Sequence, residues 1–292
     1  MNCLVTGATG FVGRELCRAL LERGDTLTAL SHSGLQLADG SPTLALDLAE
    51  EEVAIQHLEG IDVVFHLAGI AHQHAADSAY EKVNHQATLA LAEASCLAGV
   101  KHFIFLSSVK AMGLADDDQP RNEAQCSRPE DAYGLSKWQA EEGLRARFSN
   151  AAMGVSIIRP ALVYGARPKG NLALLDRGVA RGLPRPPPGG ARSMVSLTDL
   201  VSLLCLLSLD ERRGLATWIA TDGEAYSTQS IYDLLCTKHG RKPSGAWCPR
   251  WCWRLGAALL DLLGPGSESH WNKLFGTELY TNAAVLRDTG WK

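Results

Sequence analysis

Tyr133 and Lys137 are the residues whose types and spacing first suggest chemistry in this sequence. They stand four positions apart in Tyr133-Gly134-Leu135-Ser136-Lys137, so on a helix both side chains lie on one face. A cation beside a phenol favours the phenolate and lowers the pKa of the tyrosine toward the range useful for proton transfer. The same spacing also occurs in ordinary surface helices. Ser107-Ser108, which follows an apolar run, adds a hydroxyl and strengthens the prediction of a catalytic site.

A second chemical signal is a set of three glycines spaced three residues apart near the start of the chain. Glycine permits a tight turn, and the following helix would offer free N–H groups and the positive end of its dipole to a pyrophosphate. Because the turn joins an expected strand to an expected helix, it predicts a bound dinucleotide. The residues assigned to it are Gly7, Thr9, Gly10, Phe11, Val12 and Gly13.

The end of the second expected strand, which distinguishes NAD from NADP, carries no acid. An acid there would bond the ribose 2′-hydroxyl of NAD, whereas basic or small polar groups accept the 2′-phosphate of NADP. Ser31 and His32 occupy this place and favour NADP(H) slightly over NAD(H). Asp47 and Leu48 are expected near the adenine, and Leu67, Ala68 and Gly69 beneath the cofactor.

Alternating strands and helices must position these residues. Apolar runs predict strands at 3–6, 27–30, 44–46, 63–66, 103–106 and 155–158. Helical periodicity predicts helices at 12–23, 79–98 and 132–147, which end near Gly24, Gly99 and Asn150. This alternation predicts an α/β fold, a doubly wound parallel sheet of Rossmann type, with residues 1–164 as the dinucleotide-binding domain.

Residues 165–292 are expected to form a smaller, mostly helical substrate region, some segments of which return to the sheet. Helices are expected at 198–209, 230–239 and in the tryptophan-rich stretch 251–263. The last stretch is apolar enough to suggest contact with a membrane surface, but Arg254 and Asp261 interrupt it and it is too short to span a bilayer. We therefore expect it to pack in the core or at a domain interface.

The composition is that of a globular protein and argues against several partners. With 28 basic and 32 acidic residues the net charge is −4. The sequence contains no basic stripe, so binding to nucleic acid or to an anionic membrane is not expected. Eight scattered cysteines suit a reducing compartment, and Cys248 and Cys252 lack a second pair of ligands, so no metal site is expected. The chain runs from MNCLVTG directly into a strand without a signal-peptide pattern, which predicts a cytoplasmic protein.

Several motifs together resemble the extended short-chain dehydrogenase/reductase family, in the branch of UDP-galactose 4-epimerase. The resemblance covers nearly the whole chain through VTGATGFVG, FHLAGIAH, FIFLSSVKAMG, AYGLSK, IIRPALVYG, ARSMVSLTDLV and DTGW. It implies that Ser108, Tyr133 and Lys137 are catalytic, that Ser108 also contacts the substrate, and that Tyr133 and Lys137 also contact the cofactor.

The same resemblance implies that the substrate is a UDP-sugar. Matched by motif, Arg192 would hold its diphosphate, Asn171 would lie along the nucleotide, and Pro160 would line the cofactor. Family members are often dimers, which leaves a homodimer open.

The reaction has three candidates. Ser108-Val109-Lys110 stands where 4,6-dehydratases carry Thr-Asp-Glu, so dehydration is not expected. The absence of an acid at the ribose position suits NADPH, the cofactor of a reductase. The SSVK motif resembles that of bacterial reductases of UDP-4-keto-6-deoxy-N-acetylhexosamines in lipopolysaccharide O-antigen synthesis, so 4-reduction is the first hypothesis. In it Tyr133 would protonate the C4 oxygen. An NAD-dependent UDP-hexose or UDP-N-acetylhexosamine 4-epimerase is the alternative, and a non-catalytic dinucleotide sensor is the third.

Overall fold

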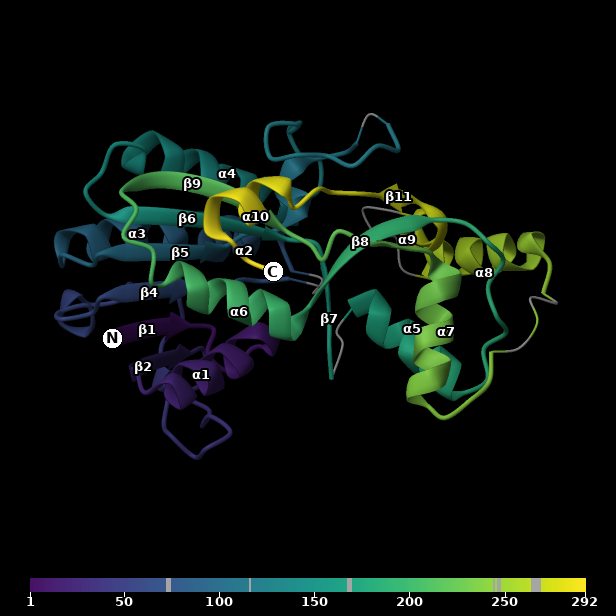
Figure 1. Cartoon of the computed structure of the whole chain (residues 1–292), viewed down its shortest axis with the longest axis horizontal. Coiled ribbons are helices and arrows are strands. Elements are labelled where there is room, and N and C mark those ends of the chain that lie inside the picture. The colour runs from purple at the N-terminus through teal and green to yellow at the C-terminus, as the bar shows by residue number, and fades with distance from the viewer. Residues whose placement is uncertain (72–74, 116, 167–169, 244, 246–247, 264–268) are drawn as a thin grey trace.

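A large parallel sheet forms the left-hand part of the molecule as drawn in Figure 1. The computed structural model describes the chain except for residues 72–74, 116, 167–169, 244, 246–247 and 264–268. In the described part, seven strands lie in the order β3-β2-β1-β4-β5-β6-β9. Six of them, each present where the sequence predicts a strand, are β1 (Asn2–Thr6), β2 (Thr26–Ser31), β3 (Leu44–Ala45), β4 (Val63–His66), β5 (His102–Leu106) and β6 (Gly154–Pro160). The predicted doubly wound fold is confirmed.

The seventh strand, β9 (Gly214–Ala220), was not among the expected strands. It pairs in parallel with β6 over seven residues, from Gly154 opposite Gly214 to Pro160 opposite Ala220. Its sequence, Gly-Leu-Ala-Thr-Trp-Ile-Ala, contains several small residues, and its pairing with β6 identifies it as a strand. A segment after residue 164 therefore completes the large sheet.

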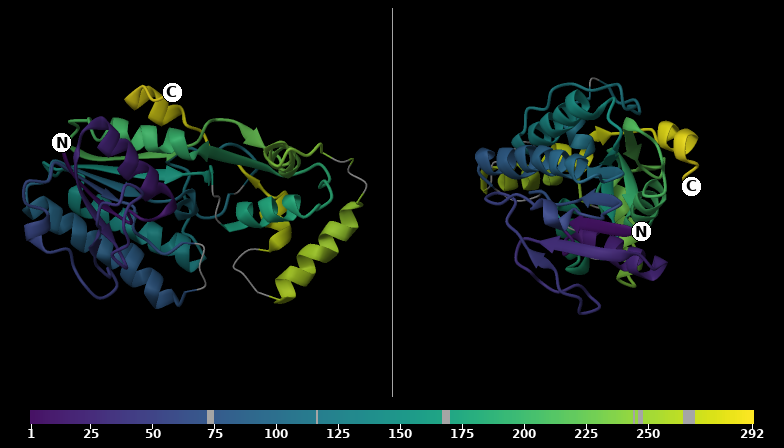
Figure 2. Two further views of the ribbon diagram at one scale, coloured as in Figure 1. Left: turned by 90° about the horizontal axis from the view of Figure 1, so that it is seen from below. Right: turned by 90° about the vertical axis from the view of Figure 1, so that its left-hand side faces the viewer.

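Helices cover both faces of this sheet (Figures 1 and 2). On one face, α1 (Phe11–Arg23), α6 (Leu197–Leu207) and α10 (Ala283–Thr289) share a core through Leu16, Leu200 and Val285. On the other face, α3 (Ala87–Leu97) and α4 (Ala132–Phe148) pack through Leu89 and Leu144. Burial on both faces explains why the central strands read as continuous apolar runs.

The helix expected at 79–98 consists of three pieces. A single turn, α2 (Asp77–Tyr80), is followed by a π-helical turn, η2 (Glu81–Gln86), and then by α3. Turns of this kind are frequently found at functional sites. Two 3-10 helices, η1 (Ile55–His57) and η3 (Val109–Met112), complete this part.

A second, smaller sheet lies beyond the carboxyl ends of the large one (Figure 1). In the described residues β8 (Ala191–Ser196) pairs with β7 (Leu162–Tyr164), β10 (Ala225–Tyr226) and β11 (Thr277–Glu278). Next to it α5 (Gly170–Ala180) and α7 (Thr228–Lys238) share a small core with Leu172 and Ile231. Two further helices, α8 (Arg250–Leu263) and α9 (His270–Phe275), complete this region.

The expectation that the stretch 251–263 packs in a core or interface is wrong for this chain. Along α8, Trp251, Leu255, Leu259 and Leu262 are exposed, and of the apolar side chains described in this helix only Ala257 is buried. The reason is the helix orientation: α8 turns its arginines toward α9 and its leucines toward solvent. None of the helices in the described ranges combines the length and apolarity needed to cross a membrane.

Candidate active site

The glycine turn between β1 and α1 is as tight as the sequence predicts. Gly7 has a φ of 69°, a conformation that favours glycine, and the Gly10 N–H donates to the Gly7 carbonyl at 2.9 Å. A Cβ on Gly13 would lie 2.2 Å from the Gly7 oxygen, and one on Gly7 would lie 2.8 Å from the backbone nitrogen of Ala68. Helix α1 therefore packs directly on the glycine turn, and the turn packs on the residues that follow β4.

The beginning of α1 fits a pyrophosphate. Its N-cap is Gly10, which supplies no capping side chain, and the first turn contains no acidic residue. The N–H groups and the positive end of the helix dipole therefore face the turn without a carboxylate to oppose an anion. Thr9, Phe11 and Val12 are partly exposed along this turn, as a cofactor-contacting surface requires.

The end of β2 is less open to a ligand than expected. Ser31 is buried and its hydroxyl bonds to the Thr43 hydroxyl at 2.6 Å. His32 is exposed and its Nε2 lies 3.3 Å from a carboxylate oxygen of Asp47. Leu48, next to Asp47, is partly exposed and packs against the core of the α3–α4 face. The Asp47 carboxylate, which the sequence assigns to the adenine, therefore also lies beside the residue expected to contact the adenosine ribose.

Beyond β4, Leu67 and Ala68 are partly exposed and Gly69 is exposed, at the edge where the cofactor is expected. A Cβ on Gly69 would lie 2.9 Å from Asn84 Oδ1 and 3.2 Å from Lys137 Nζ, so only glycine leaves room there. Pro160, at the end of β6, belongs to the same edge of the sheet and is buried.

The helix that carries Asn84 is one of the features of the family resemblance, but the sequence assigns no specific task to this residue. In the structure it links the loop after β4 to helix α4. This buried residue of η2 accepts from the Ile70 N–H at 2.8 Å and donates to the Ile70 carbonyl at 3.0 Å. It also donates to the Ser136 hydroxyl at 3.1 Å, within the catalytic helix α4. Asn84 is fully buried, and these hydrogen bonds satisfy its side-chain amide.

Tyr133 and Ser108 lie together, as the sequence predicts. The two side chains are hydrogen-bonded, and Ser108 also accepts from the backbone N–H of Lys110 at 3.2 Å at the start of η3. Asp131 caps α4 by accepting from the Gly134 N–H at 2.9 Å, which fixes the turn that carries Tyr133. The catalytic phenol and hydroxyl are therefore positioned by a helix start and a strand end.

The expected lowering of the Tyr133 pKa by Lys137 is not found. Burial raises the pKa of Tyr133 above its ordinary value, and the hydrogen bond with Ser108 only partly opposes this. Lys137 Nζ instead donates to the Leu106 carbonyl at 3.0 Å and lies 4.6 Å from the centre of the Phe105 ring. Burial also lowers the pKa of Lys137, to about 8.

A buried ion pair under the site was missed from the sequence. Glu141 follows Lys137 by four residues on the same face of α4, and its carboxylate accepts from Arg159 on β6 at 2.5 Å. It also accepts from the Ser107 hydroxyl at 2.6 Å, beside Ser108. The spacing Tyr133-x-x-x-Lys137-x-x-x-Glu141 was the signal that could have revealed it.

On the expected substrate side, Arg192 of β8 is paired with an acid. Its Nη1 donates to Glu278 on β11 at 2.6 Å, and Lys110 Nζ donates to the other oxygen of Glu278 at 2.5 Å. Burial alone would raise the pKa of Glu278, but the two cations outweigh it and hold that pKa below its usual value. Among the described residues Arg192 Nε is buried without a hydrogen-bond partner.

These contacts join the two halves of the site. Lys110 lies two residues after Ser108 and binds Glu278, which in turn binds Arg192, so the ion pairs of the substrate side begin next to the catalytic serine. Glu278 was not found from the sequence, because it lies 86 residues from Arg192. Asn171 falls in the first turn of α5, and its side chain lies outside the described residues.

Comparison with known proteins shows the family and the fold of this chain. A family model described as "NAD dependent epimerase/dehydratase family" matches residues 3–210. The chain is 32% identical over 303 residues to a "UDP-glucose 4-epimerase" of Vibrio cholerae, covering 100% of this chain and 90% of that protein. It is also similar to the structure "MoeE5 in complex with UDP-glucose and NAD", with a TM-score of 0.72, 28% identity and 83% of each chain covered. The fold is shared with the structure of a Thermus thermophilus UDP-glucose 4-epimerase in complex with NAD, with a TM-score of 0.75. That similarity has 22% identity and covers 100% of this chain and 94% of the other.

Proposed function

We propose that this chain, which belongs to the NAD-dependent epimerase/dehydratase family, inverts the configuration at C4 of a UDP-linked hexose or N-acetylhexosamine. The observation that carries the proposal is the hydrogen-bonded Tyr133 and Ser108 pair with Lys137 behind it, at the sheet edge that also carries the glycine turn. Full-length similarity to a protein named UDP-glucose 4-epimerase supports this choice of reaction. It moves 4-reduction to second place.

In this proposal each catalytic side chain has one task. The bound nicotinamide would supply the hydride acceptor and donor for C4. Tyr133 takes the proton from the C4 hydroxyl and later returns it to the C4 oxygen, and Ser108 holds that oxygen by a hydrogen bond. Lys137, fixed by the Leu106 carbonyl, orients the cofactor-facing side of the site. Glu141 and Arg159 keep Ser107, and with it the end of β5, in place.

We further propose that residues 165–292 provide the nucleotide-sugar side of the site. Arg192 Nε is a buried donor that would bond a diphosphate oxygen. The sugar would then lie along Lys110 and Glu278, between Arg192 and Ser108. Asn171, at the start of α5, is proposed to lie along the nucleotide.

For the cofactor we propose NAD(H) rather than NADP(H). The side chain of His32 is exposed at the end of β2, but Asp47 lies 3.3 Å from it, and a carboxylate there would repel a 2′-phosphate. This reverses the slight preference for NADP(H) that the absence of an acid after β2 suggested. Asp47→Asn should raise affinity for NADP+ more than for NAD+, as measured by calorimetry, and an unchanged ratio would contradict the role of Asp47.

Reduction of a UDP-4-keto-6-deoxy-N-acetylhexosamine in O-antigen synthesis is the second candidate. The observation that favours it is the hydrogen bond between the Ser31 and Thr43 hydroxyls at the end of β2. Because this bond occupies the Ser31 hydroxyl, Ser31 is not free to bind the cofactor ribose tightly. A reductase must exchange its cofactor after each turnover, whereas an epimerase must retain it. Weak ribose anchoring would therefore suit a reductase.

Product analysis by NMR separates these candidates. Purified protein is incubated with UDP-glucose and UDP-N-acetylglucosamine plus NAD+, and separately with a UDP-4-keto-6-deoxy-N-acetylhexosamine plus NADH or NADPH. Interconversion of 4-epimers without net cofactor consumption supports the proposal. Oxidation of the reduced cofactor by the 4-keto sugar alone supports reduction. Cofactor binding without turnover of any of these sugars would leave the sensor interpretation and overturn both enzyme proposals.

A further inference from the structure

The helix α8 presents a row of apolar side chains to solvent. Trp251, Leu255, Leu259 and Leu262 are exposed to 63%, 56%, 61% and 81%, and their spacing of four, four and three residues places them on one face of the helix. Exposed leucines and tryptophans are common singly, but a contiguous row on one helix marks an interaction surface. We call these four residues the apolar row.

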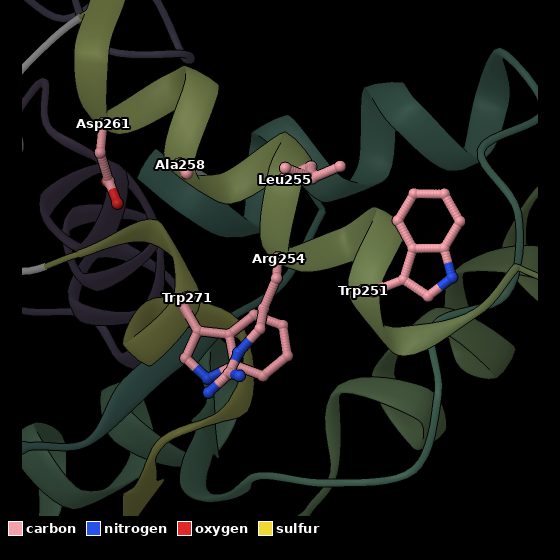
Figure 3. Close-up of a pocket in the computed structure, with 6 residues that line it drawn as sticks. All are labelled: Trp251, Arg254, Leu255, Ala258, Asp261 and Trp271. Atoms are coloured by element: carbon pink, nitrogen blue, oxygen red, sulfur yellow. The ribbon is translucent and has the colours of Figure 1, made fainter.

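The opposite side of α8 carries the charges and contacts α9. Arg254 and Arg250 lie over the ring of Trp271, at 5.1 and 5.4 Å from its centre, and Asp261 pairs with His270 at 2.6 Å. In Figure 3, Arg254 lies against Trp271 while Trp251 extends away from both. The groove between the two helices has a volume of about 630 Å³. Arg250, Arg254 and Asp261 thus hold α8 against α9. The apolar row begins at the rim of this groove, which Trp251 and Leu255 also line, and continues to solvent at Leu259 and Leu262.

The segment that carries α8 is basic in an otherwise acidic chain. Residues 238–276 contain six Lys and Arg against two Asp and Glu, a net charge of +4. The remainder of the chain has 22 basic and 30 acidic residues, a net charge of −8. Five of the six cations are exposed, and these are Lys238, Arg241, Lys242, Arg250 and Arg254. The sequence as a whole, with its charge of −4, conceals this local excess.

We propose that the apolar row and the basic segment 238–276 dock this protein onto an anionic lipid bilayer surface, with α8 lying in the plane of the interface. The leucines would enter the boundary between headgroups and acyl chains, and Trp251 has the amphipathic ring favoured at that depth. Lys238 is paired with Asp176, and Arg250 and Arg254 lie over Trp271 beside the row, so the exposed ends of these arginines and of Lys242 would reach the negative headgroups at the edge of the row. This surface lies outside the catalytic site, so the proposal does not depend on which sugar is the substrate.

A second copy of the chain fits this surface less well. Pairing of two apolar rows would bring two segments of charge +4 together, which costs electrostatic free energy. A helix of 14 residues is about 21 Å long, and one face of it offers far less than the roughly 800 Å² per partner of a stable interface. Charge and size therefore both favour the lipid surface.

Vesicle flotation with the full chain tests the proposal. Wild-type protein should float with vesicles rich in phosphatidylglycerol at least about tenfold more than with pure phosphatidylcholine, and high salt should reduce the binding. The double variant Leu255→Ser with Leu259→Ser should lose binding by at least about tenfold. A matched control, Leu97→Ser with Leu209→Ser, changes leucines that are 81% and 61% exposed elsewhere and should bind like wild type. Thermal melting checks that both variants are folded.

Two results would overturn the proposal. One is flotation that is absent, or equal for wild type and the Leu255→Ser/Leu259→Ser variant. The other is a wild-type dimer in light scattering that this same variant converts to a monomer, which would assign the apolar row to a second copy of the chain.

Discussion

The two sides of the candidate site are built from different interactions. On the cofactor side, Thr6, His66 and Thr88 form a buried chain of hydrogen bonds, at 2.7 and 2.9 Å, without a charged group among them. On the substrate side, Glu278 joins Arg192 and Lys110 through ion pairs at 2.6 and 2.5 Å. The first network is thus neutral and packed, and the second is charged and partly open to solvent.

The difference indicates what each side is able to do. A neutral network that is already satisfied holds its geometry whether or not a ligand is present. Ion pairs on the substrate side can be exchanged, because a diphosphate can replace a carboxylate as the partner of an arginine. We therefore expect substitutions on the cofactor side to affect folding and catalysis, and those on the substrate side to affect mainly substrate affinity.

The largest effect is expected at the junction of the two sides. Tyr133→Phe removes the proton-transfer group but keeps the ring, so turnover should fall by about 10²- to 10⁴-fold while the affinity for NAD+ stays the same. Steady-state kinetics and calorimetry measure the two quantities. Tyr80→Phe is the matched control, since Tyr80 lies edge-on to Tyr133 with ring centres 6.3 Å apart. Equal rates for wild type and Tyr133→Phe would remove Tyr133 from the acid and base role.

The neutral side should respond strongly to acid. Burial lowers the pKa of His66 from 6.5 to about 3, with a smaller contribution from the charge of Lys137. Between these pH values His66 is protonated in the unfolded chain but remains neutral in the folded chain. The free energy of unfolding therefore falls as the pH falls, by up to about 1.4 kcal/mol per pH unit.

Urea titrations of wild type and His66→Gln from pH 7 down to pH 4 isolate this effect, because other acid-sensitive groups are common to both proteins. The wild type should show the steeper loss of stability, while His57→Gln, a half-buried histidine in η1, should follow the wild type. Parallel curves for wild type and His66→Gln would show that the buried network tolerates a charge.

Crowding at the glycine turn should give an intermediate effect. A Cβ on Gly13 would lie 2.2 Å from the Gly7 oxygen, so Gly13→Ala should lower the free energy of unfolding by about 1 to 3 kcal/mol and weaken dinucleotide binding. Gly256→Ala in α8, where a Cβ meets nothing within 4 Å, should be neutral or slightly stabilising. Denaturant melts and NAD+ calorimetry compare them. A Gly13→Ala protein with unchanged NAD+ affinity would separate this turn from the cofactor.

The smallest effects are expected on the charged side, and they should have opposite signs. Arg192→Ala should weaken UDP binding by about tenfold, whereas Glu278→Gln, which removes the competing carboxylate, should strengthen it severalfold. Glu224→Gln changes an exposed acid just before β10 and serves as control. Calorimetry with UDP measures all three, and loss of affinity in both Arg192→Ala and Glu278→Gln would mean that Glu278 positions Arg192 rather than competing with its ligand.

Prediction from sequence succeeded where the signals were local. The glycine turn, six strands and the helix with Tyr133 and Lys137 each lie within a short stretch whose spacing reports its conformation. The extended short-chain dehydrogenase/reductase resemblance is also confirmed, by the family match over residues 3–210.

Prediction failed where distant segments meet. Glu278 pairs with Lys110 across 168 residues, and strand β9 is recognisable only through its pairing with β6. The prediction that α8 is buried was wrong, because an amphipathic sequence specifies an apolar face of a helix but not whether that face points to the core or to solvent. The pKa of Tyr133 is raised and not lowered as the sequence suggested, because desolvation depends on the packed surroundings and not on residue spacing.

Deuterium transfer at C4 tests the central claim most directly. Protein with NAD+ is incubated with UDP-glucose carrying deuterium at C4, and the product is examined by NMR and mass spectrometry. If hydride leaves and returns within a site where Tyr133 handles only the hydroxyl proton, the UDP-galactose formed keeps its deuterium at C4 and Tyr133→Phe forms almost none. Replacement of the label by solvent hydrogen, or equal product from Tyr133→Phe, would contradict the account.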